Sequence, residues 1–292
     1  MFSIERDVMI ESRPSITAQR VALRRAAHQV LDNPRVFEDP LALRIAESDE
    51  RQLRDAEPRG DRSVGSRALR AFIAARSRYA EDELARAVAR GVRQYVILGA
   101  GLDTFAYRNP HCDYSLRVFE VDHPSTQAWK RERLQTAGIR VPPLVSFVPV
   151  DFEHETLSGR LGDAGFRIGE MAFFGWLGVT PYLTHTAFSS TLSFMASAPA
   201  GSGVVFDYAV ARSALNYFER AILDALAHRV ARAGEPFRLF FEPQDLAVQL
   251  RKLGFEHVED LGAAEINMRY FSGRADGLGV RGALGRLVSA QL

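Results

Sequence analysis

A glycine-rich turn at 99–104, GAGLDT, is the part of this 292-residue chain that most directly suggests ligand chemistry. It follows the apolar run YVIL at 95–98, and Gly99 and Gly101 would let a ligand approach the backbone closely. A helix that begins after the turn would add free N–H groups and the positive end of its dipole. An ordinary strand-to-helix turn is the simpler alternative, so the glycines alone do not identify a ligand.

Two acidic residues close the next apolar run, at 116–121. Asp122 follows Gly101 by 21 residues, a spacing at which a carboxylate can accept hydrogen bonds from both hydroxyls of a ribose. Glu120 points the same way, because side chains alternate along a strand, but only one of the two acids needs to contact the ligand. We expect Asp122 to bind ribose. The alternative is that it caps a helix opened by Pro124.

A third run, at 144–150, ends in Asp151 and Phe152. An acceptor beside an aromatic ring could bind the exocyclic amine and the flat face of an adenine. A helix N-cap followed by a core phenylalanine explains the pair equally well. Together, the three strand ends predict a pocket for a ligand that contains adenosine.

Positions 103 and 104 distinguish between such ligands. A dinucleotide fingerprint, G-x-G-x-x-G, needs a small residue where this chain has Thr104, and Asp103 would repel a pyrophosphate. A carboxylate beside the turn instead suits a ligand with a cationic end, such as the amine and sulfonium of S-adenosyl-L-methionine. We therefore favour that cofactor, with an NAD-dependent oxidoreductase as the enzymatic alternative.

The elements that would position these residues alternate between short apolar runs and helical stretches. The runs lie at 95–98, 116–121, 144–150, 171–176 and 203–206, followed by a strand-like segment at 255–261. This pattern predicts an α/β fold with a doubly wound, mostly parallel, Rossmann-like sheet, in which ligands bind beyond the carboxyl ends of the strands. Helical spacing at 15–32 and 66–90 predicts a helical cover over 1–90 and a ligand-binding core over 91–292, within one structural domain.

Composition excludes several other functions. The net charge is +1, so we expect no nucleic-acid partner. The single cysteine, Cys112, rules out an internal disulfide, and the seven histidines lack metal-ligand spacing, so we predict no metal. A charged N-terminus and the lack of an 18-residue apolar run argue against export and membrane insertion, and we expect a cytoplasmic location. No G-x-S-x-G elbow or P-loop occurs.

Taken together, the motifs resemble those of the leucine carboxyl methyltransferase-like family, and most closely its bacterial branch of S-adenosyl-L-methionine-dependent methyltransferases. The matching segments are VILGAGLDT (96–104), VFEVDHP (118–124), VPVDF (148–152) and GVTPYL (178–183), preceded by HQVLDNPRVFEDPLAL (28–43). They occur in the family's order over nearly the whole chain. The family fold also implies a reversed final strand, for which the C-terminal run at 283–292 is a weak candidate.

The resemblance implies a role for individual cofactor-site residues. Gly99, Gly101 and Asp103 would form the turn near the methionine part, with Asp122 on the ribose and Asp151 and Phe152 near the adenine. Arg76 matches an arginine expected to pair with the methionine carboxylate, a planar, bidentate contact; an exposed helix arginine, or a role for Arg78 instead, are the alternatives. Leu177 departs from the family, because many relatives have an acid at this slot among the cofactor residues.

The acceptor side is less defined. Tyr182, Asp207 and Tyr208 follow the fourth and fifth runs and would face the substrate, although each could equally be a packing or capping residue. Methyl transfer needs few catalytic residues, and a carboxylate acceptor needs no general base. We expect O-methylation of a carboxylate or hydroxyl of a small molecule. A non-catalytic protein that binds an adenosine ligand is the alternative that Leu177 leaves open.

Overall fold

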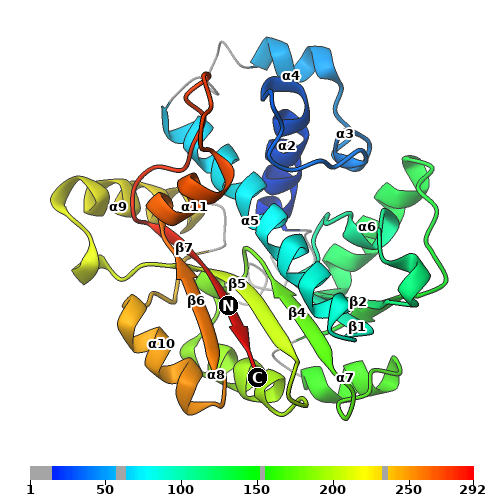
Figure 1. The fold of residues 1–292 in the computed structure, drawn as a ribbon. Helices are drawn as coiled ribbons and strands as arrows, with labels where there is room; N and C mark the ends of the chain where they lie inside the picture. Colours follow the sequence, from blue (N-terminus) through cyan, green and yellow to red (C-terminus); the bar gives the residue numbers. More distant parts are fainter. Residues whose placement is uncertain (1–14, 57–63, 152–154, 232–235) are drawn as a thin grey trace, which may run out of the picture.

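A seven-stranded sheet forms the centre of the computed structural model, which describes residues 15–56, 64–151, 155–231 and 236–292 (Figure 1). The strand order is β3-β2-β1-β4-β5-β7-β6. All pairs among β1 to β5 are parallel, and β7 runs antiparallel to both β5 and β6. The predicted doubly wound, mostly parallel sheet is confirmed. The strands are β1 Gln94–Leu98, β2 Arg117–Asp122, β3 Val145–Pro149, β4 Ala172–Trp176, β5 Gly203–Ala209, β6 His257–Leu261 and β7 Gly285–Gln291.

The central strands are almost entirely apolar, apart from Gln94 of β1 and Asp207 of β5, because helices cover both faces of the sheet. Every residue of β1, β4 and β5 is buried. Alternate residues of β1 enter different cores: Val96 and Leu98 pack with helices α7, α8 and α10, whereas Tyr95 and Ile97 pack with α5 and α11. These helices are α5 Val64–Ala89, α7 Leu157–Asp163, α8 His185–Ala196, α10 Pro243–Lys252 and α11 Ala263–Tyr270.

The remaining helices and turns connect these layers. Ser15 caps α2 by accepting a hydrogen bond from the Ala18 N–H at 3.1 Å, and Pro124 begins α6 immediately after its cap, His123. The helices are α2 Ile16–Leu31, α3 Ala42–Ile45, α4 Glu50–Ala56, α6 Pro124–Thr136 and α9 Tyr217–Ala231, and the 3₁₀ turns are Phe105–Tyr107, Cys112–Tyr114, Thr180–Tyr182 and Arg212–Ala214. None of the helices in the described ranges is long and apolar enough to cross a membrane.

Helices α2, α3 and α4 gather at one end of α5 (Figure 1). Buried charges join α2 to α5: Asp32 accepts two hydrogen bonds of 2.9 Å from Arg70 and one of 2.8 Å from His28. Burial by itself would raise the pKa of Asp32, but the bonds from His28 and Arg70 outweigh it and lower that pKa. The predicted helices at 15–32 and 66–90 are thus present as α2 and α5, with loops and the short helices α3 and α4 between them, and α2 is anchored to the helix that covers the sheet.

Candidate functional site

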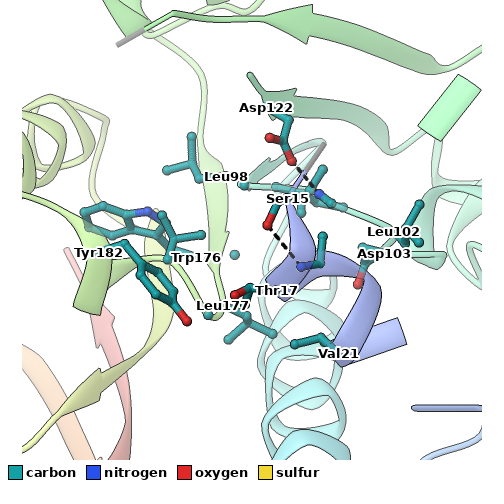
Figure 2. A pocket seen from close by; sticks show the side chains of 18 of the residues that line it. Ser15, Thr17, Val21, Leu98, Leu102, Asp103, Asp122, Trp176, Leu177 and Tyr182 are labelled. Atoms are coloured by element: carbon teal, nitrogen blue, oxygen red, sulfur yellow. Dashed lines mark hydrogen bonds between the residues drawn. The ribbon is translucent and has the colours of Figure 1, made fainter. Parts of the chain in front are cut away.

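A cavity of about 320 Å³ lies at the carboxyl ends of β1 and β4. Figure 2 shows Thr17 and Val21 of α2 on one side of it, and Trp176 and Tyr182 on the other. The glycine turn that follows β1 and the segment 175–179 at the end of β4 complete its walls. Parallel strand ends meet at this edge, as expected for a ligand site in an open α/β sheet.

The two glycines of the turn have backbone angles that favour glycine, with φ of +66° at Gly99 and +44° at Gly101. A Cβ at Gly99 would lie 2.3 Å from the side chain of Val179, and a Cβ at Gly101 would lie 3.1 Å from Ala18. Side chains here would push away the segment after β4 and helix α2. The glycines therefore allow both walls to close against the turn.

Asp122 lines the cavity beside this turn (Figure 2). Its carboxylate accepts hydrogen bonds from the Gly101 N–H at 2.5 Å and from the His123 N–H at 2.7 Å. The parallel pairing of β1 with β2 produces this contact, because it places Leu98 opposite Val121 and so brings the two strand ends together. Burial raises the pKa of Asp122, although the two N–H groups act in the opposite direction.

Asp103 also lines the cavity, and its charge is balanced by a residue of α2. Arg25 Nη1 lies 3.6 Å from the Asp103 carboxylate, while Arg25 Nη2 donates to the Leu102 carbonyl at 2.9 Å and lies 3.2 Å from Asp39. Burial by itself would raise the pKa of Asp103, but Arg25, Lys130 and Arg108 outweigh it and lower that pKa. The cavity therefore has a carboxylate that stays ionised at neutral pH.

Arg76 of α5 lines the cavity and forms an ion pair with Asp207, a residue outside the lining. Its Nη1 donates to the Asp207 carboxylate at 2.8 Å, and both side chains are buried. The other Asp207 oxygen accepts the Gly178 N–H at 2.5 Å. Gly178 has φ of +72°, and a Cβ there would lie 2.9 Å from Arg76 Nη2, so only glycine lets the guanidinium pack on this backbone. Leu177 lines the cavity as well.

Not every residue selected from the sequence lies at the cavity. Glu120 is fully buried away from it, 2.8 Å from Lys130 Nζ and bonded to the Tyr107 hydroxyl. Glu120 and Asp122 share one face of β2, as expected from the alternation of side chains, but Glu120 is two residues deeper in the strand and Lys130 of α6 covers it. Of the two acids, Asp122 is the one at the cavity, as expected.

Tyr208 and Asp207 also lie behind the cavity wall and not in its lining. The Tyr208 hydroxyl donates to Asp260 of β6 at 2.8 Å, and the Tyr208 ring packs inside the core. Tyr182, by contrast, does line the cavity, and its ring lies 5.4 Å from that of Phe237. Asp151 is half-buried and does not line the cavity, and Phe152 lies outside the described residues.

Sequence reasoning missed several lining residues. Thr17, Val21 and Arg25 come from α2, and Ser77 and Tyr95 come from α5 and β1. The helical periodicity of 15–32 indicated a buried face, but periodicity cannot show what that face covers. In the sequence, Tyr95 is indistinguishable from an ordinary core residue of a strand. Its access to the cavity depends on the missing side chain of Gly175 on the neighbouring strand, and the sequence does not show that the two residues are neighbours.

A sequence model of the leucine carboxyl methyltransferase family matches residues 18–196. The chain belongs to the leucine carboxyl methyltransferase family. A Bacillus subtilis (strain 168) protein named "Putative S-adenosyl-L-methionine-dependent methyltransferase YktD" is 33% identical over 296 residues, covering 92% of this chain and 95% of that protein. A Saccharopolyspora erythraea protein with the same description, apart from the gene name, is 32% identical and covers 70% of this chain and 71% of its own length.

A solved structure from Thermobifida fusca shares the fold. It has a TM-score of 0.58 at 17% identity and covers 96% of this chain and 95% of its own. Family membership confirms the resemblance read from the motifs. The chain is therefore a methyltransferase that depends on S-adenosyl-L-methionine.

The residues of the cavity fit this cofactor. A ribose, an ammonium and a carboxylate need, respectively, a hydrogen-bond acceptor, an anion and a cation, and the cavity offers Asp122, Asp103 and Arg76. The glycine turn leaves the backbone open to close approach, since Gly99 and Gly101 carry no side chain. The described residues contain no group of three or more histidine, cysteine or acidic residues that could hold a metal ion.

Proposed function

We propose that this protein transfers the methyl group of S-adenosyl-L-methionine to a carboxylate or hydroxyl oxygen of a small molecule. In this proposal Asp122 binds the ribose, Gly99 and Gly101 cradle the middle of the cofactor, and Asp103 and Arg76 bind its amino-acid end. Asp151 and Phe152 remain the candidates for the adenine. When bound, the cofactor supplies an electrophilic methyl group on a sulfonium.

The composition of the opposite wall supports an oxygen acceptor that needs little help from a base. The segment from Trp176 to Thr191 contributes mainly apolar residues to the cavity, and Tyr182 is its one titratable lining residue among those described. A carboxylate is already ionised at neutral pH and needs no base, whereas a hydroxyl would depend on Tyr182 or water. Holding the acceptor in line in a site that excludes water then supplies most of the rate.

The extent of the cover supports a small acceptor. Helix α2 lies against the glycine turn through Ala18 and Arg25, which leaves a cavity of about 320 Å³ between α2 and the end of β4. A cavity of this size is at the low end of the range for small-molecule sites, and in this proposal it also holds the cofactor, so little room is left for the acceptor. An apolar acceptor with one carboxylate or hydroxyl group fits these walls best.

The observation that carries the proposal is the Asp122 carboxylate at the glycine turn, inside the one cavity that also contains Arg76 and Asp103. The test is incubation with methyl-labelled cofactor and a panel of small carboxylic acids and hydroxyl compounds, with Asp122→Ala as the inactive control. Methyl esters release labelled methanol in mild base and methyl ethers do not, so the product shows which oxygen reacted. Labelling only of nitrogen or carbon acceptors would refute the O-methylation.

A further inference from the structure

Three hydroxyl groups in the wall of the cavity have no hydrogen-bond partner among the described residues. One belongs to Thr191 of α8, on the opposite wall. The other two belong to Tyr95 of β1, which is 4% exposed, and Ser77 of α5, which is 7% exposed. Both residues line the cavity. Neither oxygen is among the buried polar atoms sealed inside the protein without a partner, so both are reached from the cavity. Buried polar groups almost always have a partner, so these two hydroxyls require one from a bound molecule or water.

Tyr95 differs in this respect from the other buried tyrosines. The hydroxyls of Tyr79 and Tyr208 donate to a carboxylate at 2.7 and 2.8 Å, and the hydroxyl of the half-buried Tyr107 does so at 2.7 Å. Tyr95 has no such carboxylate, and its hydroxyl instead points at Gly175 on the neighbouring strand β4. A Cβ at Gly175 would lie 2.4 Å from that oxygen. The missing side chain thus provides the space that brings the hydroxyl to the cavity.

The surroundings of the two hydroxyls indicate which part of a ligand they meet. Ser77 follows Arg76 on α5, and Gly175 is three residues before Gly178, on which the Arg76 guanidinium packs. The charge of Asp103 acts on Tyr95, and burial above all raises the pKa of Tyr95 well above its usual value, so the hydroxyl remains protonated. Asp122, the proposed ribose acceptor, contacts the turn at Gly101. The two hydroxyls therefore lie in the part of the cavity wall that also carries the charged side chains of Arg76 and Asp103.

We propose that Tyr95 and Ser77 hydrogen-bond the amino-acid end of S-adenosyl-L-methionine and make the site selective for ligands that carry this end. The inference rests on the proposed function, which assigns Arg76 and Asp103 to the same end. Hydroxyl groups can donate to a carboxylate and accept from an ammonium, so both polar groups of the ligand's amino acid offer a partner. Adenosine compounds that lack the amino acid gain nothing from either hydroxyl.

Calorimetric titration with two ligands tests this inference. S-adenosylhomocysteine has the amino-acid end, and 5′-methylthioadenosine lacks it. In Tyr95→Phe we expect the dissociation constant for S-adenosylhomocysteine to rise about ten- to hundredfold, the usual effect of losing a hydrogen bond to a charged group, and that for 5′-methylthioadenosine to stay unchanged. Ser77→Ala should show the same selectivity. Tyr79→Phe, which removes a buried hydroxyl outside the cavity, is the matched control and should bind both ligands normally.

Thermal unfolding of the ligand-free variants separates this role from a structural one. Removing an unpaired hydroxyl breaks no bond within the protein, so Tyr95→Phe should melt at or above the wild-type temperature, whereas Tyr79→Phe should melt lower. An unchanged affinity of Tyr95→Phe for S-adenosylhomocysteine, or an equal loss for both ligands, would overturn the inference. Failure of the wild type to bind S-adenosylhomocysteine would instead refute the proposed function, and the inference with it.

Discussion

Asp122 is the residue on which the proposed cofactor site depends most. Its carboxylate accepts the Gly101 and His123 N–H groups and still faces the cavity, so its remaining lone pairs can accept from ribose hydroxyls. Burial raises the pKa of Asp122, so this carboxylate becomes protonated at a higher pH than that of an ordinary aspartate. A protonated carboxyl is a weaker acceptor for ribose than the carboxylate.

We therefore predict that wild-type affinity for S-adenosylhomocysteine falls as the pH is lowered toward the raised pKa of Asp122. Asp122→Asn should bind at least about tenfold more weakly at neutral pH and should lack most of this pH dependence. The measurement is calorimetric titration across a pH series, with the exposed Asp113→Asn as the matched control. Equal pH dependence in wild type and Asp122→Asn would remove Asp122 from the ligand site.

Loss of folding does not explain the predicted loss of affinity in acid. Because the pKa of Asp122 is raised in the folded state, the folded chain binds this proton more tightly than the unfolded chain does. The contribution of Asp122 to the free energy of unfolding therefore increases as the pH falls through this window. Circular dichroism at each pH checks that the protein is folded during the titration.

At the scale of elements, one buried arginine joins helix α2 to the glycine turn, in addition to the Asp32–Arg70 pair that joins α2 to α5. Arg25 bonds the Leu102 carbonyl and lies near the carboxylates of Asp39 and Asp103. Thr104, which distinguishes the turn from a dinucleotide fingerprint, donates to Asp39 at 2.8 Å and so belongs to this buried network. The contacts link α2 directly to the floor of the glycine turn.

Replacing this arginine should loosen α2 more than the sheet. In Arg25→Met, the carboxylates of Asp39 and Asp103 lose one cationic partner. Because Arg108 still lies 3.5 Å from Asp39, we expect a cost below the roughly 3–5 kcal/mol that is typical of an unpaired buried charge. We expect the amide hydrogens of α2 to exchange much faster, while those of β1 and β4 keep more of their protection. Native-state hydrogen exchange measures this, with the exposed Arg20→Met on the same helix as control. Protection of α2 equal to that in the wild type would show that Arg25 does not hold the helix.

The strand positions were predictable from sequence because buried parallel strands are continuous apolar runs. Each of the five runs from 95 to 206 overlaps a strand of the sheet, and the segments at 255–261 and 283–292 contain β6 and β7. The end of β5 was predicted too early, because the strand continues past its apolar run to Ala209 and so includes Asp207 and Tyr208. The short helices α4 and α11 were not predicted, since segments of seven and eight residues give little periodic signal. The burial of individual strand residues was not predictable either. The alternation of side chains fixes the face of the sheet on which Glu120 and Tyr208 lie, but it does not show which helix or strand covers them.

At the scale of the whole molecule, the reversed strand β7 completes the sheet. It lies between β5 and β6, which allows the C-terminal segment to pair along both of its edges. This is the reversed final strand that family resemblance implied and that local sequence indicated only weakly. The division into a cover at 1–90 and a core at 91–292 stays a prediction, although α5 shares one core with the sheet.

The central claim is that the cavity formed by α2, the glycine turn and the end of β4 binds S-adenosyl-L-methionine. The most direct test is calorimetric titration of the intact protein with S-adenosyl-L-methionine, S-adenosylhomocysteine and NAD in parallel. We predict saturable binding of the first two at one site per chain and no binding of NAD, because Asp103 repels a pyrophosphate and Thr104 fills the position that a dinucleotide fingerprint leaves small. Binding of NAD alone, or of none of the three, would contradict this account.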